Sequence, residues 1–221
     1  MKKNKSSKLL KLTNKEKLLR HNLETRSYWA ERDKPDHGVF SNAEKEGQKM
    51  PAAWQMTKGI TLYDWQEECV NKWLEEKRGT IKVVTGAGKT ILGLAIIERL
   101  QAEDKNLRVA IVVPTIVLQD QWYDEILRNS NPPKASIGKL GGDQRDKFDE
   151  EKRILICVLN SAAAYLPKLI GDAKMEKNLL LVADECHKAG ASYMQRVFKT
   201  KRAYNLGFRP LRKGKITTKA V

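Results

Sequence analysis

At 221 residues, the chain is long enough to form one large domain or two small ones. Its composition, 41% hydrophobic and 31% charged, is typical of a soluble protein with a buried core. The apolar runs fall well short of the roughly 20 residues that cross a bilayer, and lysines interrupt the N-terminal segment where a secretory signal needs an apolar stretch. The three cysteines are far apart, which excludes a disulfide framework or a CxxC zinc site. We therefore expect a cytoplasmic protein with no membrane partner.

Positive charge is concentrated at the two ends of the chain. The formal net charge is +15, yet the lysine-rich first twenty residues contain one acid, Glu16, and no acid follows Glu185. Lysine and arginine bind phosphates with release of condensed counterions, so this balance favours a nucleic-acid partner. Ordinary solubility is the alternative explanation of the charge.

Residues 1–57 lack sustained hydrophobic periodicity and are interpreted as a basic leader, partly helical or disordered. Leucines within residues 8–23 have the spacing of one helical stripe. An ordered packing helix and a loose nucleic-acid-binding arm explain this spacing equally well.

From Leu62 onward, short apolar runs alternate with longer segments of helical periodicity. In chain order, we predict a helix over 63–77, a strand over 80–84, a helix over 89–102, a strand over 108–113, a helix over 115–128, a strand over 154–158, a helix over 161–170, a strand over 179–183, a helix over 191–198 and a strand over 203–207. This alternation predicts an α/β fold, a doubly wound and mostly parallel sheet with helices on both faces.

The segment that joins the first predicted strand to the next helix is glycine-rich, with the sequence VTGAGKT at residues 84–90. Glycines let the backbone turn its N–H groups toward a phosphate at a helix N-terminus. Lys89 would neutralise the β- and γ-phosphates, and the Thr90 hydroxyl would bind Mg²⁺. Val83 occupies the place of the first glycine in the full GxxxxGK[ST] pattern. The predicted nucleotide contacts in this loop are Thr85, Gly86, Ala87, Gly88, Lys89 and Thr90.

A pair of acids follows the buried strand predicted over residues 179–183. In a doubly wound sheet, ligands bind at the C-terminal ends of the strands, so Asp184 should share an edge with the phosphate loop. We assign Asp184 to Mg²⁺ and Glu185 to activation of the attacking water, with Lys89 as the third catalytic residue. An exposed acidic turn is the alternative.

These two segments, TGAGKT at 85–90 and DECH at 184–187, resemble the motifs of superfamily 2 helicases of the DEAD/DEAH type. The branch that includes type III restriction subunits is the most similar, and the resemblance extends over roughly residues 60–207. It implies a RecA-like P-loop NTPase domain with ATP and Mg²⁺ as cofactors, and it favours DNA over RNA as partner.

The segment PTIVLQDQW at residues 114–122 resembles that branch's motif Ia, which grips the nucleic-acid backbone. A further strand-contacting motif is similar to residues 160–162. The resemblance therefore implies nucleic-acid contacts at Pro114, Thr115, Gln121, Asn160 and Ser161. A common strand-to-helix break is the alternative for the first two.

Two more roles come from the resemblance alone. The segment LYDWQ at residues 62–66 is similar to the family's adenine-recognising segment, which makes Gln66 the expected contact with the base. His187 is expected to couple the ATP state to the nucleic-acid side. The alternatives are an exposed helix residue for Gln66 and a helix cap for His187.

The family pattern stops after residue 207, where a Ser-Ala-Thr motif and a second domain would be expected. Residues 208–221 form a basic tail instead. Codons for residues 208–215, taken from the third base of the Phe208 codon, can encode Ser-Ala-Thr-Pro-Glu-Arg-Glu. We hypothesise a frameshift that truncated the protein; a coding DNA whose shifted frame lacks this peptide would rule it out.

We therefore predict that residues 58–207 are the ATP-binding domain of a nucleic-acid-dependent ATPase, a DNA helicase or translocase. Arginines of a second helicase domain, or of a partner subunit, normally stabilise the transferring phosphate. Without them, the chain should bind ATP but hydrolyse it poorly. The alternative function is a non-catalytic nucleic-acid-binding module, and another P-loop enzyme such as a kinase ranks third.

Overall fold

The computed structural model describes residues 49–84, 86–185, 191–210 and 218–219. The α-helices are α2 (Asp64–Glu76), α3 (Lys89–Glu103), α4 (Ile116–Asn129), α5 (Leu159–Ala173) and α6 (Ala191–Phe198). The strands are β1 (Arg78–Val83), β2 (Arg108–Val113), β3 (Ile137–Gly141), β4 (Gln144–Arg145), β5 (Ile154–Val158), β6 (Leu179–Asp184), β7 (Tyr204–Pro210) and β8 (Thr218–Lys219). Short 3₁₀ turns occupy Lys134–Ser136 and Glu176–Asn178.

The strands form one sheet in the order β4-β3-β5-β2-β6-β7-β1-β8. All neighbours from β3 to β1 are parallel, and the two-residue strands β4 and β8 pair antiparallel at the edges. The C-terminal ends of the parallel strands therefore share one edge of the sheet. That edge receives the phosphate loop from β1 and the acidic pair from β6.

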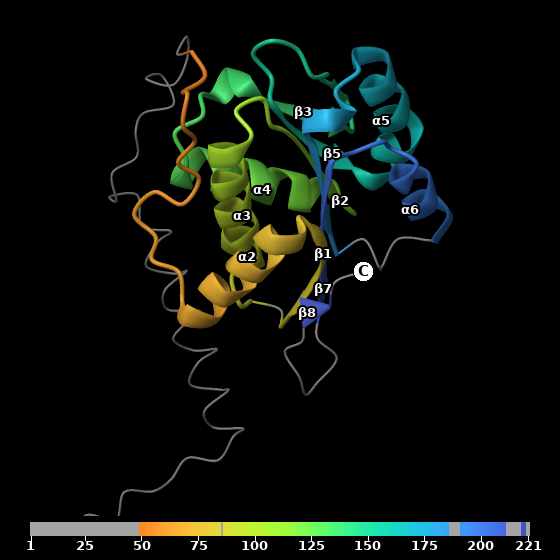
Figure 1. Cartoon of the computed structure of the whole chain (residues 1–221). Coiled ribbons are helices and arrows are strands. Elements are labelled where there is room, and N and C mark those ends of the chain that lie inside the picture. Colours follow the sequence, from red (N-terminus) through yellow and green to blue (C-terminus); the bar gives the residue numbers. More distant parts are fainter. Residues whose placement is uncertain (1–48, 85, 186–190, 211–217, 220–221) are drawn as a thin grey trace, which may run out of the picture. The chain divides into compact units, whose positions relative to one another are not determined.

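Alternation along the buried strands divides the core between the two faces of the sheet. In β2, Val109, Ile111 and Val113 belong to the cluster under α2, α3 and α4, whereas Ala110 and Val112 pack with α5 and α6. Figure 1 shows the same two groups of helices on opposite sides of the sheet. The predicted doubly wound α/β fold is confirmed.

The predicted helices and strands lie within a few residues of the observed ones, but the two outermost strands on one side of the sheet, β4 and β3, were not predicted. No strand was predicted over β3 or β4, because β3 is a short segment that contains two glycines, Gly138 and Gly141. At Gly141 a Cβ atom would lie 2.6 Å from Val158 Cγ2, so the close approach of β3 to β5 there requires glycine.

The last long strand extends further than its predicted end at residue 207. It continues to Pro210 and pairs residue by residue with β1, with Phe208 beside Ile81. Phe208 is the first residue of the segment interpreted as an aberrant tail, and it is buried in the core. Its side chain fills space between the sheet and α3, since a Cβ atom at Gly93 would lie 3.3 Å from its ring.

Residues just before the predicted domain boundary at 57 also pack on the core. Trp54 and Met56 are buried. The Trp54 N–H donates to Gln101 Oε1 at 3.0 Å, and the Met56 N–H donates to Glu98 Oε2 at 2.6 Å. This segment is thereby fixed to α3, while residues 1–48, including the helix expected over 8–23, lie outside the described residues.

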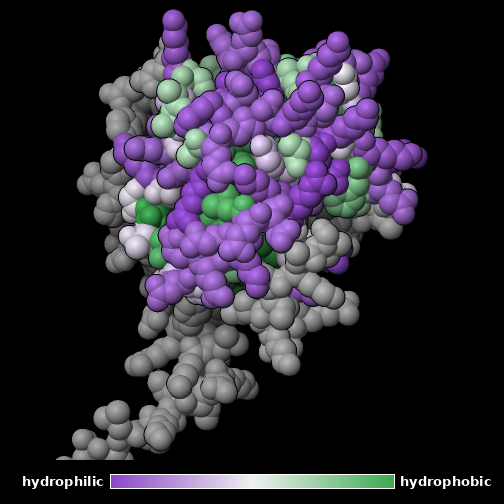
Figure 2. Space-filling view, viewed as in Figure 1, coloured by the Kyte–Doolittle hydropathy of each residue, from purple (hydrophilic) through white to green (hydrophobic). Residues whose placement is uncertain are grey.

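The surface over this core is predominantly hydrophilic on the face seen in Figure 2, where hydrophobic residues show only in small groups. Within the described residues, no helix is long and apolar enough to cross a membrane.

We expect Met56→Ala to lower the free energy of unfolding by about 2–5 kcal/mol, because it would leave a cavity against α3. Gln55→Ala is the matched control, since the neighbouring Gln55 side chain is exposed. Urea denaturation of both variants measures the difference. Equal stabilities would contradict a packed role for this segment.

Candidate nucleotide-binding site

The phosphate loop lies between β1 and α3 and takes its shape from two glycines. Gly86 and Gly88 have φ angles of 85° and 78°, in the left-handed region that side chains disfavour. The Ala87 N–H donates to the Val84 carbonyl at 3.2 Å, which closes the turn. A Cβ atom at Gly88 would also lie 2.9 Å from Gln66 Nε2, so a side chain there would displace the Gln66 amide. Thr85 lies outside the described residues.

Lys89 is the first residue of α3, and its side chain turns toward the acidic pair. The ammonium group contacts Glu185 Oε1 and lies 4.0 Å from Asp184 Oδ1. All three side chains are largely buried, with Lys89 only 11% exposed. The structure thus brings Lys89 to an acidic pair that lies far from it in the sequence, at the edge where the strand ends meet.

Asp184, the last residue of β6, is almost entirely buried. Burial raises the pKa of its carboxyl group, while the hydrogen bond from Trp122 and the charge of Lys89 act in the opposite direction. The Trp122 indole N–H donates to Asp184 Oδ2 at 3.0 Å. Trp122 enters the site without a predicted role, and its only signal in the sequence is its place at the end of PTIVLQDQW.

Glu185 has a φ angle of 47°, an unusual left-handed conformation for a residue with a side chain. Such strained residues cluster at functional sites, where the surrounding structure holds them in place. In this conformation its carboxylate faces Lys89. His187 lies outside the described residues, so its coupling role stays a prediction.

Gln66 connects the predicted adenine segment to the phosphate loop. Its Oε1 accepts from the Tyr63 N–H at 3.0 Å, and its Nε2 donates to the Ala87 carbonyl at 3.4 Å. With 4% exposure it is not the exposed helix residue of the alternative interpretation. A direct contact with the base stays a prediction, since both ends of the amide are bonded within the protein.

The donor set suits Mg²⁺ bound together with phosphates. Mg²⁺ usually takes one or two carboxylates, substrate phosphate oxygens and water, and Thr90 and Asp184 would supply the protein ligands. Thr90 directly follows Lys89 in the first turn of α3. In the part of the chain that the structure describes, no group of three or more His, Cys, Asp or Glu residues forms a separate metal cluster.

The candidate nucleic-acid contacts lie at the same edge of the sheet. Pro114 and Thr115 follow β2, and Asn160 and Ser161 lie in the first turn of α5 after β5. These two strands pair up to their last residues, so the two segments are neighbours. Thr115 is exposed, and its side chain caps α4 by accepting from the Leu118 N–H at 3.3 Å. Gln121 is exposed on α4.

Comparison with known proteins identifies the family of the chain. Residues 59–209 match the family described as the type III restriction enzyme res subunit. The chain is 36% identical over 151 residues to the DNA 3'-5' translocase XPB2 of Sulfurisphaera tokodaii, a match that covers 67% of this chain and 30% of that protein. It is 25% identical over 134 residues to the ATP-dependent DNA helicase uvsW of Enterobacteria phage T4, which covers 60% of this chain and 26% of that protein.

Two solved structures share the fold. The UvsW helicase from bacteriophage T4 superposes with a TM-score of 0.56 at 19% identity, over 78% of this chain and 60% of that chain. The Sulfolobus solfataricus SWI2/SNF2 ATPase core in complex with dsDNA gives a TM-score of 0.54 at 16% identity, over 73% and 34%. The present chain spans less than a third of the full length of the XPB2 translocase and of the uvsW helicase named above.

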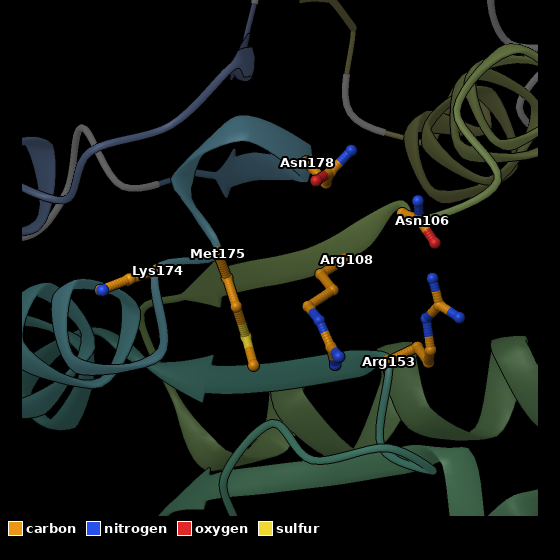
Figure 3. A pocket seen from close by; sticks show the side chains of 6 residues that line it. All are labelled: Asn106, Arg108, Arg153, Lys174, Met175 and Asn178. Carbon is orange, nitrogen blue, oxygen red and sulfur yellow. The ribbon is translucent and has the colours of Figure 1, made fainter.

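A basic pocket of about 210 Å³ lies at the opposite edge of the sheet (Figure 3). Arg108 begins β2, and its Nη1 donates to the carbonyls of Asp149 at 2.6 Å and Lys152 at 3.3 Å. Arg153 precedes β5, and its Nη2 donates to the Lys105 carbonyl at 3.1 Å. Burial and the neighbouring Arg153 lower the pKa of Arg108. We therefore assign both arginines to bracing the loops that precede β2 and β5.

Arg108→Met should lower the free energy of unfolding by about 2 kcal/mol, because the backbone carbonyls lose a charged donor. The corresponding fall in melting temperature is roughly 4–8 °C for a domain of this size. Lys174→Met is the control, because the exposed Lys174 lines the same pocket but points away from the arginines (Figure 3). Thermal denaturation in which both variants melt together would show that the loops do not depend on Arg108.

Proposed function

Because this chain belongs to the type III restriction enzyme res subunit family, we propose that it is the ATP-binding domain of a DNA helicase or translocase. The observation that carries the proposal is the meeting of the loop lysine with the two acids, where Lys89 Nζ lies 4.0 Å from Asp184 Oδ1. A lysine-bearing amide loop and a metal-binding carboxylate at one edge of a sheet are the groups that a magnesium-bound triphosphate needs.

We assign each group of the site a separate task. The N–H groups of the phosphate loop would hold the β-phosphate, and Lys89 would bind the β- and γ-phosphate oxygens. The Lys89–Glu185 contact of the structure would then be exchanged for these phosphate contacts. The released carboxylate of Glu185 could orient and deprotonate the attacking water. Thr90 and Asp184 would hold Mg²⁺, which supplies Lewis-acid stabilisation of the charge on the phosphates.

We further propose that the edge formed by Pro114, Thr115, Asn160 and Ser161 contacts the nucleic-acid backbone, with Gln121 as an additional contact. DNA is favoured over RNA because the names of several relatives specify DNA. The net charge of +15 supports such a partner. A second helicase domain or a partner subunit would complete the ATP site, and we place the protein in the cytoplasm.

The alternative is a non-catalytic nucleic-acid-binding module, which would have no use for Lys89. We expect Lys89→Ala to lower the affinity for a fluorescent ATP analogue, measured in the presence of Mg²⁺, by about 10- to 100-fold, because a charged hydrogen-bond donor to the phosphates is lost. Lys105→Ala removes the same charge from an exposed loop residue and should bind as the unmodified chain does. Equal affinity in the unmodified chain and Lys89→Ala would favour the non-catalytic module.

The nucleic-acid contact can be tested without loss of the α4 cap. Thr115→Asp preserves a capping oxygen but adds a negative charge, so we expect several-fold weaker binding of duplex DNA at low salt with unchanged stability. Asn106→Asp adds the same charge to an exposed residue at the opposite edge and is the control. Anisotropy titrations with duplex DNA and duplex RNA measure the loss of affinity in each variant and the preference for DNA over RNA. Tighter RNA binding, or equal loss in the two variants, would argue against the proposed surface.

A further inference from the structure

Trp122 is buried in the middle of α4, and its one polar atom is directed at the candidate metal ligand. The indole ring is 1% exposed, and Nε1 donates to Asp184 Oδ2 at 3.0 Å. Indole nitrogen can only donate, and a buried indole N–H usually requires an acceptor. The contact therefore joins two groups that each lack access to water.

This hydrogen bond distinguishes the two oxygens of the carboxylate. Oδ2 accepts from the indole, while Oδ1 is the oxygen that lies 4.0 Å from Lys89 Nζ. Because the two oxygens of a carboxylate are chemically equivalent, a half-turn of the group would restore the same hydrogen bond, but any smaller rotation would break the bond to Trp122. The indole therefore fixes the plane of the carboxylate, in which the second oxygen is presented to the phosphate loop.

The indole itself is held firmly. A Cβ atom at Gly93 of α3 would lie 2.8 Å from Trp122 Cη2, so the ring fits directly against the backbone of α3. One turn earlier in α4, Gln119 Nε2 donates to the Ile156 carbonyl at 2.7 Å and ties the helix to β5. The ring is thus closely packed between α3 and the carboxylate that it contacts.

We propose that Trp122 is a positioning residue that orients Asp184 for Mg²⁺, and that it links α4 to the nucleotide site. The proposal rests on the ATP-binding function inferred above. Partners that orient metal ligands are typically worth 10- to 100-fold in metal affinity. The same helix begins beside the candidate nucleic-acid contact Thr115, so a displacement of α4 would reach the carboxylate through one hydrogen bond.

The test compares two buried tryptophans whose indole N–H groups both donate. Trp122→Phe removes the bond to Asp184, whereas Trp73→Phe removes a bond of 3.2 Å to the Asn205 carbonyl, away from the acids. Affinity for a fluorescent ATP analogue is measured by anisotropy in Mg²⁺ and in EDTA, and the ratio gives the gain due to Mg²⁺. We expect Trp122→Phe to reduce this gain about tenfold or more, with little change in EDTA, and Trp73→Phe to retain it.

Gly93→Ala is a second variant, which keeps the indole but displaces it from α3, and it should also reduce the gain. Circular dichroism establishes that each variant is folded. Equal weakening in Mg²⁺ and EDTA would reduce Trp122 to a packing role and overturn the inference, as would an unchanged gain in both variants. Absence of Mg²⁺-dependent binding in the unmodified chain would overturn the proposed function as well.

Discussion

The site depends on one buried lysine placed between two carboxylates. An ammonium group removed from water is costly unless opposite charges compensate it, and here Asp184 and Glu185 supply them. The compensation works only if the ends of β1 and β6 stay at one edge of the sheet. The parallel strands, the positive-φ glycines and the buried indole all serve to keep these three side chains together.

Much of this arrangement can be predicted from local patterns. The buried strand before Asp184 and the GxGKT segment before α3 place Lys89 and Asp184 at a common edge, because the C-terminal ends of parallel strands coincide. Strand β3 could not be found in this way, since its two glycines hide any hydrophobic alternation. The Trp122–Asp184 bond joins residues 62 positions apart, and only the tertiary packing of α4 specifies it.

The helix α4 contributes both to the candidate nucleic-acid edge and to the nucleotide site. The sequence suggests the first contribution but not the second. Its first turn is capped by Thr115 at the candidate nucleic-acid edge, and its second turn carries the indole that holds Asp184. Gln66 is a comparable case, because a residue expected to face the base also binds the phosphate loop through Ala87. In the first case one helix, and in the second one side chain, joins two neighbouring parts of the site.

The position of β7 between β6 and β1 has a consequence for synthesis of the protein. The strand that leads into the phosphate loop and the strand that ends in Asp184 do not pair with each other; both pair with β7. In a ribosome-bound chain from which residues 204–210 have not yet emerged, β1 and β6 therefore lack the strand that aligns them. Pairing of such distant segments is also intrinsically slow. The capacity to hold a nucleotide would thus be acquired only after β7 has emerged.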